Sequence, residues 1–384
     1  MTSKHRSAMI RKRFIKLSVG GVVVAGCAAY LLSDRRNLRR ADIPSAEGDS
    51  PAYLRPDEEA ILLLASLAPS GHNTQPWSVD HLEPFHWIIG NDRRRWLPAV
   101  DPSQRETLLS LGAFLQNLEF AAGAFGYVCQ WTLLAATNQD ERVMDVRLTK
   151  NGPLNVLNIE AMKSRRTLRA GFSPEPLRHD DIARLVSGEP DFIRYFPTGS
   201  RESRFIDEQT VEANLLQAYR DRAQEELADW IRFSSKEVRA YRDGLTTGTM
   251  EIAGVSGWAV RNFYDRTSVL KKSFRERTIG QVREQVASSA GWIAITSPDA
   301  SVASLLETGR RMQRLFLKVR GCGIGMHPMT QILEEPATRL SLSSAIDLGA
   351  RVQFLLRVGY VKDYPPPASL RRPLSWFLRK GDGR

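Results

Sequence analysis

Two segments of this 384-residue chain resemble each other at a constant separation of 197 residues, and this similarity limits the available folds more than any other sequence feature. Both segments, Glu106 to Phe125 and Ala303 to Val319, carry apolar residues at every third or fourth position, as amphipathic helices do. Amphipathic helices ended by glycine share some residues through composition alone. A true duplication would mean that one chain carries both subunits of an ancestral symmetric dimer. The matched positions are Leu108 with Leu305, Leu109 with Leu306, Gly112 with Gly309, Gln116 with Gln313, Leu118 with Leu315 and Gly126 with Gly323.

The formal net charge of +11 is unevenly distributed. Residues 1–41 carry ten Lys and Arg residues and one acid, Asp34, whereas residues 42–370 sum to −2. Nucleic-acid-binding proteins need a clustered basic face, because much of their affinity comes from phosphate contacts. The nearly neutral body therefore argues against a nucleic-acid partner.

The cysteines and histidines form no recognisable metal-binding pattern. Cys27, Cys129 and Cys322 lack the spacing of a zinc site or a CxxC motif, and the six histidines form no HExxH motif. We expect neither a metal site nor a disulfide framework. The acidic runs Asp57-Glu58-Glu59 and Glu334-Glu335 are interpreted as solvated helix ends rather than acid–base pairs.

Residues 1–33 are interpreted as a leader. Arg11-Lys12-Arg13-Phe14-Ile15-Lys16 precedes an apolar run from Leu17 to Leu32, which resembles a twin-arginine translocation signal with Lys in place of the second arginine. The run is shorter than the roughly 20 residues of a membrane helix, yet long for a cleaved signal core. Four interpretations stay open: an export signal, a transmembrane anchor, a lipoprotein signal ending at Cys27, and a buried helix of a soluble protein. We expect an exported or membrane-anchored chain, with the periplasmic side favoured by the slight excess of basic residues before the run.

The remaining chain predicts an α+β body. Residues 34–56 are polar and Pro-containing, as in a linker, and a helix starts near Asp57. Five segments have the short apolar or alternating pattern of strands: 86–90, 129–134, 143–148, 292–297 and 352–360. We place the first half at residues 57–160 and the second, with a basic tail, at residues 161–384.

The decapeptide from Ala68 to Trp77, APSGHNTQPW, is a turn constrained by Gly and Pro. It presents a hydroxyl, an amide and backbone N–H groups to one place, although an ordinary loop between two elements has the same pattern. Ser70 and His72 are only two residues apart and no acid is placed beside them, so they are weak evidence for a hydrolase.

Basic and glycine-rich segments follow in the second half. Arg165-Arg166-Thr167-Leu168-Arg169 can form a charge-assisted fork around a phosphate, or can be an exposed Arg-rich helix end. Arg371-Arg372 forms a second basic pair. The glycines within Gly321 to Gln331 follow a helix rather than a strand, so the context of a dinucleotide-binding loop is missing and a helix C-cap with a turn is expected.

Together these segments resemble the FMN-dependent nitroreductase family, and most closely its fused, leader-bearing Acg-type subgroup. The resemblance covers most of residues 57–376 and implies a central, mainly antiparallel sheet flanked by helices. It is weakest at residues 200–285, where residues 241–279 are interpreted as a family-specific lid.

The resemblance also implies which residues bind FMN. The turn would lie against the flavin, the fork would hold the phosphate through Arg165 and Thr167, and Arg169 would lie near the pyrimidine ring. A loop would cover the central ring, and the basic pair would reach the phosphate. The implied turn, loop and pair residues are Pro69, Ser70, Gly71 and Asn73; Pro328, Met329, Thr330 and Gln331; and Arg371 and Arg372. No residue is assigned as catalytic, because the flavin supplies the chemistry.

The motifs are divided unequally between the halves. The first half has the turn but no fork, and the second has the fork and the tail but no such turn. In the family, one site combines the fork of one subunit with the turn of the other. The resemblance therefore implies one composite site in a monomeric, fused pseudo-dimer.

The expected function is an FMN-binding oxidoreductase that passes electrons from NAD(P)H or another donor to a nitroaromatic or quinone-like acceptor. Two rivals remain. One is a protein that sequesters flavin or senses redox state without turnover, and the other is a membrane-anchored scaffold without a ligand.

Overall fold

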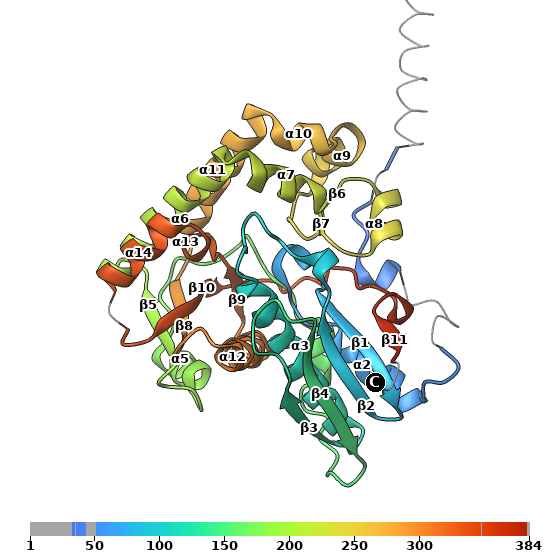
Figure 1. Ribbon diagram of the computed structural model, residues 1–384. Coiled ribbons are helices and arrows are strands. Elements are labelled where there is room, and N and C mark those ends of the chain that lie inside the picture. Colours follow the sequence, from blue (N-terminus) through green and yellow to red (C-terminus); the bar gives the residue numbers. More distant parts are fainter. Residues whose placement is uncertain (1–32, 35, 44–50, 347, 382–384) are drawn as a thin grey trace, which may run out of the picture.

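The computed structural model describes residues 33–34, 36–43, 51–346 and 348–381 (Figure 1). The apolar run of the leader and Cys27 lie outside these residues. Among the helices that the structure describes, none combines the length and the apolar character needed to cross a membrane.

Two sheets form the framework of the body. One sheet has the order β11-β1-β2-β4-β3 and the other the order β5-β8-β10-β9. All neighbours are antiparallel except β1 and β11, which are parallel. The strands are β1 (Trp77–Glu83), β2 (His86–Asn91), β3 (Val128–Leu133), β4 (Arg142–Thr149), β5 (Ile193–Pro197), β8 (Gly291–Ser297), β9 (Ile324–Pro328), β10 (Arg351–Tyr360) and β11 (Leu378–Lys380).

The two sheets repeat one topology. In the first half, β2 leads into α3 (Arg105–Ala124), then β3 and β4, with β4 between its two neighbours in the sheet. In the second half, β8 leads into α12 (Val302–Gly321), then β9 and β10, with β10 in the middle. The chain thus contains two related halves, each with its own mainly antiparallel sheet, and the predicted α+β fold class is confirmed. The five predicted strands and the two predicted long helices are confirmed.

Helices α3 and α12 pack against each other between the two sheets (Figure 1). At their crossing, a Cβ on Gly112 would lie 2.0 Å from the carbonyl oxygen of Leu306, and a Cβ on Gly309 would lie 2.0 Å from that of Leu109. Both pairs interchange when 197 residues are added to one partner and subtracted from the other. This reciprocity is the signature of an isologous, two-fold interface.

Polar residues beside the crossing obey the same symmetry. Gln313 donates to Asn117 Oδ1 at 2.7 Å, and Arg314 donates to Gln116 Oε1 at 2.6 Å. The repeated sequence positions are therefore the positions that join the two halves.

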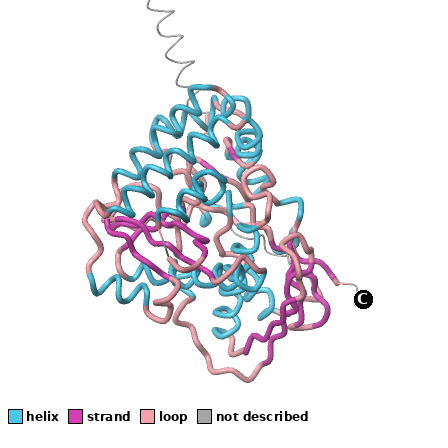
Figure 2. Tube along the Cα trace, turned by 60° about the vertical axis from the view of Figure 1, so that its left-hand side comes forward, coloured by secondary structure: helices cyan, strands magenta, loops and turns pink. Residues whose placement is uncertain are grey.

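A helical cap is inserted between β5 and β8. It consists of α6 (Arg201–Tyr219), α7 (Asp221–Asp229), β6 (Ile231–Arg232), α8 (Ser235–Tyr241), β7 (Leu245–Thr246), α9 (Gly254–Phe263), α10 (Arg266–Leu270) and α11 (Lys272–Ala287). Helices α7, α9, α10 and α11 lie at the top of Figure 1, and Figure 2 shows helices gathered at the same end. Part of the cap has a small core of its own around Phe233, Val260 and Val269.

Segments from both ends of the chain pack on the body. The segment interpreted as a linker is docked where it is described: Asp34 accepts from Ser235 Oγ at 2.7 Å, and η1 (Arg40–Asp42) contacts the C-terminal arm through Arg40 N and Pro367 O at 3.4 Å. The C-terminal arm, residues 361–381, reaches the first half and adds β11 to its sheet. Other helices are α2 (Pro56–Ala65), η2 (Gly71–Asn73), η3 (Arg93–Arg95), α4 (Ile159–Ser164), α5 (His179–Val186), α13 (Gln331–Glu334), α14 (Pro336–Ala345) and η4 (Leu374–Trp376).

The solvated helix ends predicted at two acidic runs are wrong. Glu58 is fully buried and accepts hydrogen bonds from Phe85 N and Trp87 Nε1 at 2.7 and 3.2 Å. Glu335 is also buried and pairs with Arg220 at 2.6 Å. A run of acidic residues in the sequence does not reveal the partners of Glu58 and Glu335, because these partners come from other segments of the chain.

Candidate functional site

The decapeptide turn has an unusual backbone. His72, Asn73 and Gln75 have positive φ angles of 48°, 55° and 53°, and the Ser70 hydroxyl accepts from Gln75 N at 2.9 Å. Non-glycine residues in the left-handed region are strained and persist where surrounding contacts enforce them. Several such residues in one turn therefore indicate a place with strong tertiary restraints.

The C-terminal arm and the cap impose these restraints. Arg371 Nη1 donates to Asn73 Oδ1 at 3.0 Å, and Arg372 N donates to Gln75 Oε1 at 2.9 Å. From the cap, Gly244 N donates to Asn73 O at 3.2 Å. The structure thus brings together the turn and the basic pair, which are almost 300 residues apart in the sequence.

The two arginines of the basic pair, Arg371 and Arg372, donate hydrogen bonds to different backbone segments. Arg371 donates to the carbonyl oxygens of Ser66, Leu67 and Ala68 at 2.6, 3.0 and 3.0 Å, where α2 runs into the turn. Arg372 donates instead to Trp77 O at 2.8 Å and is buried on the other side. Only Arg371 shares a partner with the fork, because Arg165 Nη2 also donates to Leu67 O at 3.2 Å.

Arg165 and Arg371 form a buried, positively charged centre. Burial lowers the pKa of Arg165 to about 10. Burial, aided by the charges of Arg40 and Arg165, holds the pKa of Arg371 well below its ordinary value. The hydrogen bonds described for Arg165 and Arg371 end on carbonyl, amide or hydroxyl oxygens rather than on carboxylates.

The cap holds the rest of the fork through Glu251. Its carboxylate accepts from Arg166 Nη2 at 3.0 Å and from Arg169 N at 2.9 Å. Arg169 Nε also donates to Thr249 O at 3.0 Å. Thr167, half-buried, lies between these two arginines in the sequence. The cap residues Thr249 and Glu251, which lie within the predicted lid, therefore hydrogen-bond directly to the fork.

Arg169 is also joined to His327. The atoms Arg169 Nη1 and His327 Nε2 are 2.7 Å apart. Burial, reinforced by Arg169 and Arg357, lowers the pKa of His327 well below its ordinary value. The neutral imidazole consequently accepts from the guanidinium through Nε2 and carries its hydrogen on Nδ1. His327 Nδ1 is a buried atom for which the described residues provide no partner.

The loop after β9 contains the other predicted residues. Pro328 ends β9, Met329 is buried, and Thr330 Oγ1 donates to Glu334 at 2.9 Å. Within the described chain, the buried Oε1 of Gln331 has no hydrogen-bond partner. The loop thus presents a polar group that remains available to a ligand.

Acidic residues connect this loop with the turn. A Cβ on Gly71 would lie 3.4 Å from Glu106 Oε2. Burial raises the pKa of Glu334 to about 8 with help from the charge of Glu106. Burial lowers the pKa of His72 to about 4, although Glu106 opposes this change. The turn, the start of α3 and the end of α13 therefore meet around Glu106.

The raised pKa of Glu334 should make the stability of the fold depend on pH. Because the pKa is about 8 when folded and near 4.5 otherwise, folding favours the protonated acid, and its contribution to stability falls as pH rises through this interval. Glu334→Gln should therefore match wild type in urea unfolding at pH 4.5 and exceed it by on the order of 1 kcal/mol at pH 8.5. Glu160→Gln, whose parent side chain is 85% exposed, is the control. Parallel pH profiles for wild type and Glu334→Gln would refute the assignment.

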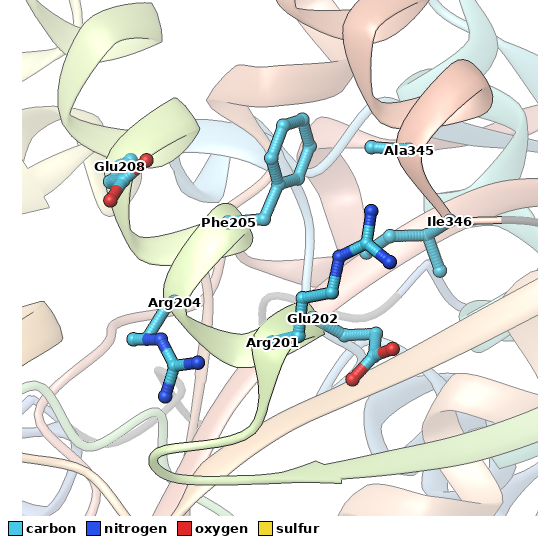
Figure 3. Close-up of a pocket in the computed structure, with 7 residues that line it drawn as sticks. All are labelled: Arg201, Glu202, Arg204, Phe205, Glu208, Ala345 and Ile346. Carbon is cyan, nitrogen blue, oxygen red and sulfur yellow. The ribbon is translucent and has the colours of Figure 1, made fainter.

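The site fits a phosphate-bearing flavin on the chemistry of its donors. Arg165 and Arg371 provide buried positive charge, while His327 Nδ1 and Gln331 Oε1 provide a donor and an acceptor that have no partner among the described residues. A surface pocket of about 230 Å³ lies elsewhere, between the start of α6 and the end of α14 (Figure 3). The predicted site residues do not line it. Its lining is Arg201, Glu202, Arg204, Phe205, Glu208, Ala345 and Ile346.

Sequence reasoning missed four residues of the site: Glu106, Glu251, His327 and Glu334. His327 directly precedes the predicted loop, so its position offered a signal. Glu251 lies in the segment of weakest resemblance, and no pattern there indicated its partners. Glu334 was assigned to solvent.

The chain is similar to two curated proteins over most of its length. No protein-family model matches the sequence. A Mycobacterium tuberculosis protein provisionally named NAD(P)H nitroreductase acg is 27% identical over 348 residues, which cover 85% of this chain and 97% of that protein. The Serratia protein PigM, provisionally named an NAD(P)H nitroreductase, is 24% identical over 314 residues, which cover 77% of this chain and 86% of PigM.

A solved structure shows weaker similarity. The FMN-dependent nitroreductase NfnB from Mycobacterium smegmatis, solved with NADPH, is 16% identical with a TM-score of 0.36, and the match covers 58% of this chain and 97% of NfnB. A score this low supports no argument about the site. The similarity to the curated relatives, in contrast, spans nearly their whole length. Over most of its length, the chain is similar to proteins named as NAD(P)H nitroreductases, the acg protein among them.

Proposed function

We propose that this chain binds one FMN between its two halves and uses it to pass electrons from NAD(P)H to a small nitroaromatic or quinone-like acceptor. The observation that supports this proposal most is the buried pair Arg165 and Arg371 beside the strained turn, because no carboxylate of the described residues pairs with either guanidinium. The full-length similarity to relatives named as NAD(P)H nitroreductases supports the reaction class.

The proposal gives each group a role. Arg165, Thr167 and Arg371 hold the phosphate, and Arg169 faces the pyrimidine ring while His327 keeps its guanidinium oriented. The bound flavin supplies the transfer of hydride and electrons. The turn residues Pro69, Ser70, Gly71 and Asn73 and the loop residues Pro328, Met329, Thr330 and Gln331 form the walls beside the ring. Arg372 supports the turn through its hydrogen bonds to Gln75 and Trp77, and in this proposal it does not contact the phosphate.

A direct test is anaerobic reduction of the purified, flavin-loaded chain. With NADH or NADPH, the oxidised flavin absorbance should bleach and return when a nitroaromatic or a quinone is added. Retained flavin that neither nucleotide reduces would contradict the reductase proposal.

The same structure favours one alternative, a protein that holds flavin without turnover. Glu251 and Thr249 fix Arg166 and Arg169 from the cap, and Gly244 contacts the turn, so the cap binds both sides of the site. If the cap restricts access for a nicotinamide, flavin would be retained but not reduced. Loosening the cap with Glu251→Gln should then permit reduction by NAD(P)H, whereas a reductase should lose activity or remain unchanged.

We also propose that the leader anchors or exports the chain, with the body on the periplasmic side. Trp258 Nε1 in α9 donates to Ser33 Oγ at 2.8 Å, so the first described residue lies beside α9. The same helix exposes Val255 at 81% and Phe263 at 69%. These apolar side chains are suited to a membrane surface next to an apolar leader. Cell fractionation of the full chain should recover it from membranes or periplasm, and recovery only from cytosol would contradict the proposal.

A further inference from the structure

The segment between the leader and the body carries an arginine into the buried positive centre. Arg40 Nε donates to Ser369 O at 3.1 Å, and Arg40 Nη2 donates to Ser369 Oγ at 3.3 Å. Arg371 Nη1 donates to the same hydroxyl at 3.0 Å. A single side chain, Ser369, therefore bridges Arg40 and Arg371.

Arg165 completes the arrangement on the other side. Its Nη2 shares the Leu67 carbonyl with Arg371 Nη2, at 3.2 and 3.0 Å. Burial, with the charge of Arg165 adding to it, lowers the pKa of Arg40 to about 9. The three guanidinium groups are thus close enough to repel one another in a poorly solvated place. An anion would offset this cost, since buried charges are normally paired.

The centre retains unused hydrogen-bonding capacity. Arg165 is only 3% exposed, and its Nε is a buried atom that finds no partner among the described residues. A guanidinium has five N–H donors in a planar fork that matches phosphate oxygens. A buried fork with a free donor points to a ligand with several acceptor oxygens.

Contacts with the cap fix the segment that carries Arg40. Asn262 Nδ2 in α9 donates to Asp34 O at 3.0 Å, and Asn37 Nδ2 donates to Ile252 O at 3.3 Å. Arg40 follows Ser33 by seven positions, a separation that spans at most about 25 Å when extended. Arg40 is therefore positioned by the folded protein, within a short distance of the leader.

We propose that Arg40 is the third guanidinium of a phosphate-monoester site shared with Arg165 and Arg371. The segment between leader and body is then part of the cofactor site. This inference rests on the proposed function, in which the ligand is FMN and the bound group is its phosphate. It also means that removal of residues 1–41 would remove a ligand of the cofactor together with the leader.

The test compares FMN with riboflavin, which has the same ring system without the phosphate. The full chain, stripped of flavin, would be titrated with each compound as wild type, Arg40→Ala, Arg40→Lys and Arg36→Ala. Arg36 is exposed on the same segment and is the matched control. Arg40→Ala should weaken FMN binding about 10-fold or more and riboflavin binding by less than about twofold, because one charge-assisted contact is lost. Arg40→Lys, which keeps the charge but loses the fork, should show an intermediate loss.

Equal losses for FMN and riboflavin, or FMN binding unchanged in Arg40→Ala, would overturn the assignment. If Arg40→Ala fails to fold by circular dichroism, the FMN-specific loss in Arg40→Lys decides. Thermal melting with inorganic phosphate separates this inference from the proposed function. Stabilisation of wild type and Arg36→Ala, with a smaller effect in Arg40→Lys and none in Arg40→Ala, would support the anion site even in a chain that binds no flavin. The absence of both phosphate stabilisation and a preference for FMN would end the inference.

Discussion

Gly112→Ala should destabilise the chain by about 3 kcal/mol or more, measured by urea unfolding, and should lower the yield of folded protein. The new Cβ would lie 2.0 Å from the Leu306 carbonyl oxygen, so α3 and α12 would have to move apart. No change of side-chain rotamer can relieve this contact, because the obstructing carbonyl oxygen of Leu306 belongs to the backbone. The change acts at the crossing that joins the two halves and their sheets.

Gly123→Ala is the matched control for this experiment, because Gly123 lies near the end of the same helix. Within the described part of the chain, its added Cβ would meet only Asn155 Cβ, at 3.9 Å. Alanine favours helix over glycine by roughly 1 kcal/mol, so this variant should be neutral or slightly more stable. A Gly112→Ala variant as stable as Gly123→Ala would show that the helices do not cross as described.

Arg371→Ala should have the largest effect on the cofactor, reducing FMN affinity by about 100-fold or more. Arg371 binds the carbonyl oxygens of Ser66, Leu67 and Ala68 as well as Asn73 Oδ1. Its loss would remove a phosphate contact and also free the strained turn that lies beside the ring. Riboflavin binding should therefore weaken too, unlike in Arg40→Ala. Fluorescence titration of the flavin-stripped full chain measures both.

Arg379→Ala is the control within the same C-terminal arm. Arg379 is largely exposed and pairs with Asp80 at 3.3 Å, and exposed pairs of this kind contribute little. Flavin affinity should stay at the wild-type value in this variant. A folded Arg371→Ala chain with wild-type FMN affinity would remove Arg371 from the site.

The sequence predicted the parts of the fold that depend on local periodicity. Helices α3 and α12 and the five strand segments follow from the spacing of apolar residues. The 197-residue separation also located the helix crossing, because Gly112 and Gly309 are repeated positions. Strands β1, β5, β6, β7, β9 and β11 were not predicted, and most of them are short. Strand β9 lies within Gly321 to Gln331, where a helix C-cap and a turn were expected, and gains its pairing from β10.

The candidate site was less accessible to sequence reasoning. The turn, the fork and Arg371 were recognised by resemblance, and the structure brings these segments together. Adjacent residues in an extended arm face opposite sides, but the sequence does not indicate which of Arg371 and Arg372 faces the fork. Arg40 was assigned to a linker on composition, and its role depends on contacts with residues more than 300 positions away.

The account is tested most directly by the flavin content of the full chain purified in detergent. Flavin released by denaturation should be identified as FMN by chromatography and quantified against protein. The account predicts about one FMN per chain, bound to a monomer. A colourless chain that also fails to bind added FMN would contradict it.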